Sequence, residues 1–387
     1  MREPEVVINH HGASRLLAGH LWVYRSDIRS ASAQGGDVVC VRDERGRLLG
    51  RAFYSDRSEI CLRLVTREDV PVDRTLLRAR IARAAELRRS IVGDAPAYRL
   101  VYGESDQLPS LIVDRYGDYL VLQTLSQATE RRKQELVEIL LELFAPRGIV
   151  ERNDPKVRLL EGLDQRVALL WGTVPEEVVL REGPLEMAYD LFHGQKTGGF
   201  LDQRENRRVA AGYARGQALD CFAGTGGFTL AIASRCSAVE AVDLSPEALK
   251  MLTRNAERNR VENVSVREAN AFDLLRQYDD SGRRFDCIIL DPPAFAKNKQ
   301  NIPAAYRGYK EINLRSLKIL RPGGILITCS CSHHISESMF WQILHEASRD
   351  AGRHLIILEK RTQSSDHPIL VSMPETYYLK CFICSAL

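Results

Sequence analysis

The 387-residue sequence lacks long hydrophobic runs. Its apolar runs have only the length of a β-strand, which excludes a transmembrane helix and a membrane partner. The first residues, MREPEVVINHHG, lack the charged and then apolar pattern of a signal peptide, so we expect a cytoplasmic protein. Nine cysteines scattered over this length favour reduced thiols over a disulfide framework.

Lysine is also scarce, because only ten of the 54 basic residues are lysines. Arginine suits forked contacts to phosphate and stacking on bases, although a biased genome composition would give the same excess. The net charge of +3 excludes a globally basic protein. Basic residues gather locally in DRTLLRARIARAAELRRS (73–90), where six arginines accompany two acids and apolar residues recur with a helical period. We predict a helix with an apolar side and a basic side, the latter either solvated or facing RNA.

Three regions differ in their predicted elements. Residues 1–70 hold short strand-like runs, including GDVVCVRDERGRLLGRAFYS, whose turn at 44–46 is typical of a hairpin, and indicate a small β domain. Residues 71–180 join the basic helix to an α+β domain, with a further helix in ATERRKQELVEILLELF. From 181 to 387, strands and helices alternate, which predicts a mostly parallel sheet with helices on both faces. The tail, PILVS and then YYLKCFICS, predicts two strands and an antiparallel end to this sheet.

The stretch LDCFAGTGGFTLAIA (219–233) gives the strongest cofactor signal. A strand ends at Asp220 and enters a turn with Gly224 and Gly226, where the backbone can approach a ligand. The turn departs from the G-x-G-x-x-G pattern of dinucleotide folds, and a carboxylate before it suits the ammonium group of S-adenosylmethionine (SAM) better than a pyrophosphate. Asp243 ends the second strand 23 residues later, where it can accept hydrogen bonds from both ribose hydroxyls.

After the third strand, Asn270 and the amide of Ala271 could contact an adenine. The order and spacing of these groups predict SAM as the cofactor. A nucleotide cofactor and a doubly wound core with incidental acids are the alternatives.

Two motifs follow the fourth and fifth strands. IILDPPAFAKNK (288–299) places Asp291 at the carboxyl edge of the sheet. Alone, D-P-P-x-F would suggest methylation of an exocyclic base nitrogen, and its two lysines offer phosphate contacts. LITCSCSHH (326–334) places Cys331 at the same edge and Cys329 deeper in the strand. A thiolate that adds to C6 of cytosine makes C5 nucleophilic, and a nearby acid stabilises the adduct.

Cys331 is therefore the candidate nucleophile and Asp291 its partner, with a structural cysteine as the alternative. His333 and His334 are expected on the surface of a loop. We predict no metal site, because the only C-x-x-C, at 381–384, lacks a second ligand pair at zinc spacing.

Taken together, these motifs resemble the bacterial 23S ribosomal RNA cytosine-C5 methyltransferases, over nearly the whole chain. RLLAGHLWVYRSDI, GDVV and LGRAFYS are similar to their PUA domain, and YRLVYGESDQLPSLIVDRYGD and ERND…LEGL to their central α+β domain. HGQKTGGFLDQRENR (193–207), DPPAFAKNK, RGYKEINLRSLKIL, SCS and DHP follow the family order in a Rossmann-like SAM methyltransferase domain with a mostly parallel, seven-stranded sheet. The resemblance implies 5-methylcytosine formation in 23S RNA or a large-subunit precursor, and a homodimer.

The resemblance also implies roles for single residues. It implies Cys331 as the nucleophile and Asp291 as its partner at the base. The predicted cofactor-binding residues are Phe200, Gln203, Asp220, Phe222, Gly224, Gly226, Asp243, Leu244, Asn270 and Ala271. The predicted RNA-binding residues are Trp22, Arg78, Lys196, Arg204, Lys297, Lys299 and Arg307, and Gln195 is expected near the site.

The sequence departs from the family pattern at two places. Asn270 stands where an Asp is expected, although its amide oxygen can still accept from an adenine amino group. Pro293 and Ala294 stand where the wider group of RNA C5 enzymes has a second cysteine that releases the product, so the base that removes the C5 proton is not identified. The competing functions are methylation of a base nitrogen, with a structural Cys331, and a non-catalytic RNA-binding ribosome assembly factor.

Overall fold

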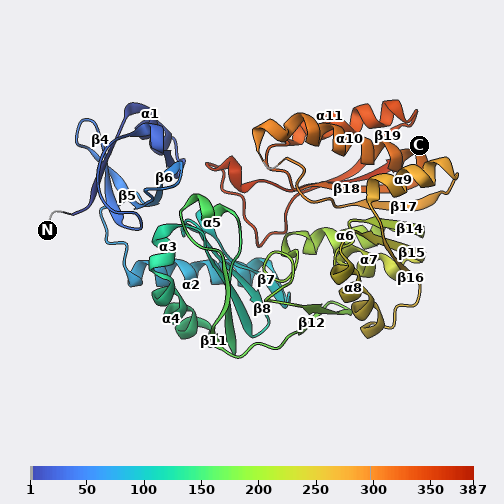
Figure 1. Ribbon diagram of the computed structural model, residues 1–387, viewed down its shortest axis with the longest axis horizontal. Helices are drawn as coiled ribbons and strands as arrows, with labels where there is room; N and C mark the ends of the chain where they lie inside the picture. The colour runs from blue at the N-terminus through green and yellow to red at the C-terminus, as the bar shows by residue number, and fades with distance from the viewer. Residues whose placement is uncertain (1–2, 297) are drawn as a thin grey trace. The chain divides into compact units, whose positions relative to one another are not determined.

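A computed structural model describes residues 3–296 and 298–387. The chain divides into two compact units, each assembled from separate stretches of sequence. Unit 1 comprises Met1–Glu182, Tyr189–Leu201 and Ser365–Thr376. Unit 2 comprises Gly183–Ala188, Asp202–Ser364 and Tyr377–Leu387. In Figure 1 the N-terminal part of unit 1 runs from blue to green, and unit 2 continues to red at the C-terminus.

The first part of unit 1 is a small β domain with a six-stranded sheet in the order β2-β6-β5-β4-β1-β3. Its elements are β1 Glu5–Ile8, α1 His10–Leu17, β2 Trp22–Tyr24, β3 Ile28–Ser32, β4 Val38–Asp43, β5 Leu48–Tyr54 and β6 Ile60–Thr66. β4 and β5 pair antiparallel across a tight turn in which Gly46 has φ +80°, so the predicted hairpin is confirmed.

The second part of unit 1 is an α+β domain with a five-stranded sheet in the order β11-β10-β9-β8-β7. Its strands are β7 Ala97–Tyr102, β8 Leu111–Tyr116, β9 Tyr119–Thr124, β10 Gly148–Asn153 and β11 Arg166–Gly172. Its helices are α2 Arg74–Ile91, α3 Gln127–Arg131, α4 Lys133–Phe144 and α5 Val157–Leu160. The single helix predicted near 128–144 is thus two helices that meet at Arg132.

Helix α2 forms where it was predicted, but its basic side is narrower than expected. Arg80 is buried and donates to the carbonyls of Val65 and Gln107 at 2.7 and 2.5 Å. Arg88 is fully buried, and its Nη1 lies 2.5 Å from Oδ1 of Asp106. Two of the six arginines therefore hold unit 1 together internally, because a buried guanidinium needs several hydrogen-bond acceptors.

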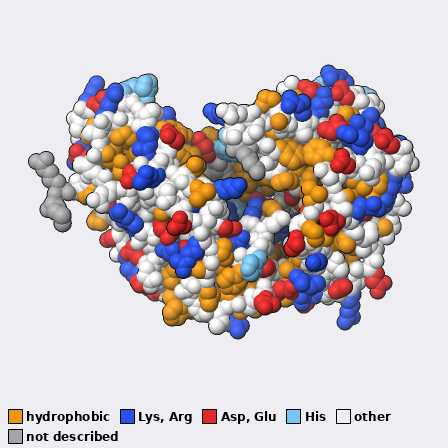
Figure 2. Space-filling view, viewed as in Figure 1, with side chains coloured by type: hydrophobic (Ala, Val, Ile, Leu, Met, Phe, Trp, Pro, Cys, Tyr) orange, Lys and Arg blue, Asp and Glu red, His pale blue; other side chains and the backbone are white. Residues whose placement is uncertain are grey.

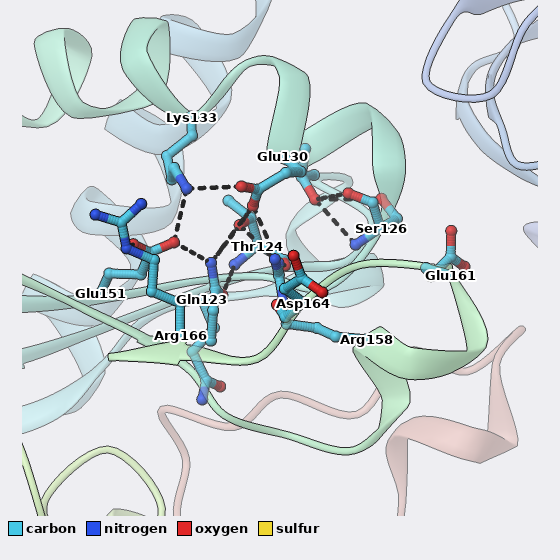
Figure 3. A network of polar contacts seen from close by, with 12 residues as sticks. Gln123, Thr124, Ser126, Glu130, Lys133, Glu151, Arg158, Glu161, Asp164 and Arg166 are labelled. Atoms are coloured by element: carbon cyan, nitrogen blue, oxygen red, sulfur yellow. Dashed lines mark hydrogen bonds and ion pairs between the residues drawn. The ribbon is translucent and has the colours of Figure 1, made fainter. Parts of the chain in front are cut away.

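A polar network ties the helices of this domain to its sheet (Figure 3). Nζ of Lys133 lies 2.6 Å from Glu130 and 2.7 Å from Glu151, which is fully buried in β10. Arg158 in α5 is 3.0 Å from the other oxygen of Glu130, and Asn153 donates to Glu151 at 2.6 Å. The ERND motif therefore builds a paired polar core, which explains charged side chains in a buried strand.

Two later segments of the chain complete unit 1. In the segment 189–201, Thr197 donates to Asp114 of β8 at 2.6 Å, and its hydroxyl pairs with that of Tyr116 at 3.1 Å. In the segment 365–376, Asp366 accepts from the backbone amide of Arg99 at 2.7 Å. The HGQKTGGF and DHP motifs thus provide internal contacts of unit 1.

Unit 2 contains a seven-stranded sheet in the order β16-β15-β14-β17-β18-β20-β19. Its strands are β14 Gly216–Cys221, β15 Cys236–Asp243, β16 Val264–Glu268, β17 Phe285–Leu290, β18 Leu320–Ser330, β19 Leu355–Arg361 and β20 Lys380–Ala386. β20 pairs antiparallel with both of its neighbours, while the remaining pairs are parallel. This confirms the Rossmann-like fold. The predicted strand at PILVS is wrong, because that stretch is irregular and belongs to the segment 365–376 of unit 1.

Helices cover both faces of this sheet (Figure 1). They are α6 Arg204–Tyr213, α7 Gly227–Ala233, α8 Pro246–Arg258, α9 Ala271–Asp280, α10 Ile302–Ile319 and α11 Glu337–Asp350. α9, α10 and α11 pack in one apolar core, and α6 and α7 in a second core on the opposite face. β12 Val178–Glu182 and β13 Leu185–Tyr189 precede these elements in the chain. Among the described residues, no helix combines the length and apolar character needed to cross a membrane.

Candidate active site

Asp220 lies near the carboxyl end of β14 and is 1% exposed. Its Oδ2 accepts a hydrogen bond from Thr229 of α7 at 2.6 Å, while its buried Oδ1 has no partner among the described residues. Burial, reinforced by the negative charges of Asp291 and Asp243, raises the pKa of Asp220 to about 7. A buried carboxylate with a vacant acceptor suits a cation, which would return it to the ionised form.

The glycines after Asp220 serve two purposes. Gly224 has φ +54°, and a Cβ added there would meet no atom within 4 Å, so this side of the turn is open. Gly226 has φ +92°, and its Cβ would lie 2.7 Å from Cγ of Leu252 in α8. The first glycine therefore leaves room for a ligand, while the second allows helix α8 to approach.

Asp243 fixes the other side of this turn. Its Oδ2 accepts from the amide of Gly224 at 2.8 Å, and its Oδ1 from the amide of Ser245 at 2.9 Å. Each oxygen keeps a second lone pair for a ligand hydroxyl. Ser245 also caps α8, with Pro246 in its first turn, as predicted. The next residue along from Asp243, Leu244, exposes 62% of its surface.

Asn270 caps helix α9, where its Oδ1 accepts from the amide of Phe272 at 2.9 Å. Asparagine performs this capping as well as aspartate does, so the departure from the family pattern leaves the local fold intact. Asn270 is exposed, whereas Ala271 is 4% exposed. The open glycine turn, the vacant oxygen of Asp220 and the anchored carboxylate of Asp243 together fit SAM.

Asp291, directly after β17, is held by a chain of hydrogen bonds. Nε2 of Gln203 donates to its Oδ1 at 2.8 Å, and Nδ2 of Asn206 donates to Oε1 of Gln203 at 2.7 Å. Nε of Arg361 in β19 donates to Oδ1 of Asn206 at 2.9 Å. Each donor orients the next amide, so a charged guanidinium is connected to Asp291 through two side chains.

Cys331 follows β18, which lies beside β17. Its Sγ donates to the carbonyl of Pro292 at 3.6 Å, which places the thiol next to the Asp291 loop. The structure describes all nine cysteines; eight are buried, and Cys331 is partly exposed. Cys329 is 1% exposed and lies opposite Cys381, so the predicted difference in depth between the two thiols is confirmed.

Ser332 fixes the backbone after Cys331. Its hydroxyl accepts from the amide of Ala296 at 3.2 Å and pairs with the hydroxyl of Tyr309 in α10 at 2.9 Å. Its carbonyl accepts from Nζ of Lys380 at 2.8 Å. The second serine of the SCS triplet thus connects three elements around the thiol. No group of three His, Cys, Asp or Glu side chains within the described ranges could hold a metal ion.

Comparisons with known proteins agree with this geometry. A PUA-like domain model matches residues 6–67, and a methyltransferase domain model matches residues 214–370. "Ribosomal RNA large subunit methyltransferase I" of Tolumonas auensis is 40% identical over 383 residues, covering 96% of each chain. The protein of the same name from Vibrio cholerae is 40% identical over 379 residues, covering 95% of this chain and 96% of the relative. The chain belongs to this methyltransferase family. SAM is therefore its cofactor.

Solved structures show the same fold over almost the full length of this methyltransferase. A putative SAM-dependent methyltransferase from Streptococcus mutans has a TM-score of 0.85 at 21% identity, covering 98% of this chain and 99% of that chain. A putative methyltransferase complexed with SAH has a TM-score of 0.87 at 22% identity, with the same coverage. At these identities the likeness concerns the fold alone.

Phe295, the aromatic residue of the D-P-P-x-F motif, packs inward in this methyltransferase. Its ring centroid lies 4.6 Å from that of Tyr309, 5.8 Å from that of Phe272 and 6.5 Å from that of Phe222. Phe222 has φ +67°, a left-handed conformation that is uncommon outside glycine. The motif therefore contributes its aromatic ring to a cluster beneath the site.

Several predicted RNA-binding residues of unit 1 have partners within the protein. Nε1 of Trp22 donates to Glu104 at 2.9 Å, and Nε of Arg78 lies 2.7 Å from Glu142. Lys196 has φ +54°, and its Nζ lies 4.5 Å from the ring centroid of Phe200. Lys196, Phe200 and the exposed Gln195 all belong to the unit 1 segment 189–201, so their predicted roles near the catalytic site stay predictions.

The predicted RNA-binding residues of unit 2 differ in exposure. The side chain of Arg204 is only 13% exposed and lies 3.5 Å from Glu205, which leaves little of its guanidinium for RNA. Lys299 and Arg307 are exposed and have no acidic partner among the described residues. Lys297 lies outside the described residues. In Figure 2, basic and acidic side chains are interspersed on the visible surface, in keeping with the small net charge.

Sequence reasoning missed four residues of the site: Asn206, Tyr309, Arg361 and Lys380. Asn206 and Tyr309 lie inside motifs that were recognised, QRENR and RGYKEINLRSLKIL, but nothing in the sequence indicated what they contact. Lys380 did offer a signal, since it is a rare lysine at the start of an otherwise apolar strand.

Proposed function

We propose that this protein forms 5-methylcytosine in large-subunit ribosomal RNA through a covalent bond between Sγ of Cys331 and C6 of the target cytosine. The observation that best supports the proposal is the position of Cys331. It is the one incompletely buried thiol, and it lies at the end of the strand next to Asp291. A nucleophilic thiol must reach its substrate, whereas structural cysteines are buried and inert.

The chain's residues suit the steps of this reaction. The Cys331 thiolate adds to C6, forming an S–C6 bond and moving electron density toward C5. Asp291, oriented by Gln203, stabilises the adduct near N3 of the base. Asp220, Asp243 and the glycine turn would hold SAM, which when bound would supply the methyl group. Loss of the C5 proton to a base restores the double bond and releases the thiolate.

The packing of Phe295 bears on the main alternative, methylation of a base nitrogen. Such chemistry needs Asp291 and a nearby carbonyl to accept amino hydrogens, with an aromatic ring that presents its face to the base. Here the ring of Phe295 packs against Tyr309 at an interplanar angle of 41°, and the carbonyl of Pro292 accepts from Cys331. The inward packing of the ring favours cytosine C5 over a base nitrogen.

The RNA substrate is part of the proposal, because the relatives are named for modifying large-subunit ribosomal RNA. A PUA-like domain at residues 6–67 and the exposed cations Lys299 and Arg307 suit contacts to RNA phosphates. The target base would have to leave its helix or lie in a loop to reach Cys331. The cytoplasmic location and the homodimer stay predictions.

Trapping the covalent adduct tests the proposal. Large-subunit ribosomal RNA containing 5-fluorocytosine is incubated with SAM and wild-type protein, Cys331→Ser or Cys329→Ala. Fluorine at C5 cannot leave as a proton does, so the adduct persists and is detected by denaturing electrophoresis. Wild type and Cys329→Ala, the matched control at a buried thiol, are expected to form it, and Cys331→Ser is not.

Each other outcome has a definite meaning. No adduct with wild type, together with methylated RNA, would indicate methylation of a base nitrogen. An adduct that persists in Cys331→Ser would remove Cys331 as the nucleophile. RNA binding without any methylation would favour an assembly factor.

A further inference from the structure

Lys380 is a buried cation at the start of β20. It is 2% exposed, and in the sheet it lies directly opposite Ser330, the last residue of β18. β18 ends at Ser330. Nζ of Lys380 donates to the carbonyl of Ser332, just beyond this strand end, and to the carbonyl of Tyr378, both at 2.8 Å. No carboxylate among the described residues forms an ion pair with it. Two residues on, the same face of the strand holds Phe382 in the apolar core.

Packing does not explain a lysine at this position. Burial lowers the pKa of Lys380 to about 8, so its charge is held at a cost to stability. An ammonium has three hydrogens, and the two carbonyl contacts use only two of them. A buried charge of this kind is commonly retained for function, and Lys380 interacts electrostatically with two nearby groups, a thiolate at Cys331 and the carboxylate of Glu337.

Among the described residues, three other ionisable groups near Cys331 are acidic or neutral. Asp291, after β17, is acidic and disfavours a thiolate. Tyr309 of α10 is neutral, since burial raises its pKa to about 12. Glu337 of α11 is acidic, and it accepts from Tyr377 at 2.7 Å and pairs with Lys360.

Two histidines, His333 and His334, follow in the loop after β18, one exposed and one half-buried. Among the described residues, Lys380 is therefore the buried cation nearest in the structure to this strand end, with Nζ bonded to the carbonyl of Ser332, the residue after Cys331. A thiol acts as a nucleophile near neutral pH only where a cation or a base favours its ionised form.

We propose that Lys380 is a positioning residue for Cys331, whose ammonium stabilises the thiolate while its hydrogen bonds fix the backbone that carries the sulfur. The inference rests on the proposed role of Cys331 as the nucleophile and adds the origin of its reactivity. Lys380 does not touch the base or the cofactor in this scheme. It acts through the charge and position of Cys331.

The test measures the ionisation of Cys331 in the full chain without RNA. The alkylation rate of the Cys331 peptide by iodoacetamide is followed by mass spectrometry from pH 6 to pH 10. The variants are Lys380→Gln, which removes the charge but keeps an N–H donor, Lys380→Met, which removes both, and Lys380→Arg, which keeps the charge. Thermal unfolding and SAM titration verify that each variant folds.

Loss of the charge is expected to raise the apparent pKa of the Cys331 thiol by about one unit or more in Lys380→Gln and Lys380→Met, which is about tenfold less thiolate at neutral pH. Lys380→Arg is expected to stay near wild type. A purely structural lysine predicts instead that Lys380→Gln behaves as wild type, which would overturn the inference. If Lys380→Met does not fold, Lys380→Gln alone decides.

Failure of this inference and of the proposed function are distinguishable. An unchanged thiol pKa in Lys380→Gln, with a Cys331-dependent adduct in wild type, leaves the nucleophile in place and removes Lys380. A shifted pKa without any adduct in wild type leaves the electrostatic pair in place and removes the covalent mechanism. When Cys331 is the nucleophile and Lys380 stabilises its thiolate, the rate of adduct formation in Lys380→Gln is expected to approach that of wild type as the pH rises.

Discussion

The substitution Asp220→Asn tests whether this carboxylate exists to hold a cation. Asparagine has the same shape and can keep the hydrogen bond from Thr229, but it has no charge. In the folded protein the pKa of Asp220 is about 7, raised from 3.8 mainly by burial. The folded state therefore holds a proton that the unfolded state has released between these values, so the carboxylate destabilises the fold increasingly as the pH rises from about 4 to 7.

The size of this effect follows from the shift. The pKa of Asp220 is about three higher in the folded state than in the unfolded state, which lowers the free energy of unfolding by about 4 kcal/mol above pH 7. Less than half of this loss is already present at pH 5. The free energy of unfolding of Asp220→Asn, relative to wild type, should thus rise by about 2–3 kcal/mol between pH 5 and pH 8. For a unit of this size that is roughly 5–10 °C in melting temperature.

The assay is thermal unfolding at pH 5 and pH 8, with and without SAM. Asp273→Asn, the same change at an exposed position of α9, is the matched control and should show little dependence on pH. With SAM, the order is expected to reverse, because Asp220→Asn would lose the proposed ion pair with the cofactor and should bind SAM at least tenfold more weakly at pH 8. Equal melting differences at the two pH values, or unchanged SAM affinity, would refute the reasoning.

Three further predictions concern the same unit. Gly224→Ala should lower stability by about 1 kcal/mol through its positive φ but weaken SAM binding more, since the new Cβ enters the open side of the turn; titration and thermal unfolding separate the two effects. Gln203→Leu should lower the methylation rate about tenfold by releasing Asp291, and it should lower stability by about 1–3 kcal/mol because buried hydrogen-bond partners are left unpaired; methylation assays and thermal unfolding measure the two effects. Lys299→Ala and Arg307→Ala should each weaken RNA binding and reduce the slope of log affinity against log salt by about 1, measured by filter binding.

Much of unit 2 could be predicted from sequence because its signals are local. Each strand is a short apolar run, each turn begins with a polar or glycine residue, and Ser245 with Pro246 marks the start of a helix. Alternating strands and helices predict a mostly parallel sheet, and the expected pairing of the fourth and fifth strands was enough to place Asp291 and Cys331 at one edge. The same locality made the β4–β5 hairpin recognisable.

The errors arose where distant contacts decide the structure. PILVS has the composition of a strand but no sheet neighbour, and its segment instead docks on unit 1 through Asp366 and the backbone of Arg99. Arg80 and Arg88 follow the helical period of exposed arginines but find acceptors in other elements. The local sequence pattern does not indicate the hydrogen-bond chain that ends at Arg361. It also does not indicate that Lys380 donates to Ser332.

The sheet order explains why the chemistry gathers at one edge. The neighbouring strands β15, β14, β17, β18 and β20 each contribute one group there, in the order Asp243, Asp220, Asp291, Cys331 and Lys380. Three adjacent carboxylates repel one another, and this repulsion adds to burial, which is the main cause of the raised pKa of Asp220. A cationic cofactor would relieve that repulsion at one end of the row, and the proposed action of the Lys380 ammonium would oppose it at the other. The thiol lies between Asp291 and Lys380, so its reactivity depends on which of these two charges acts on it more strongly.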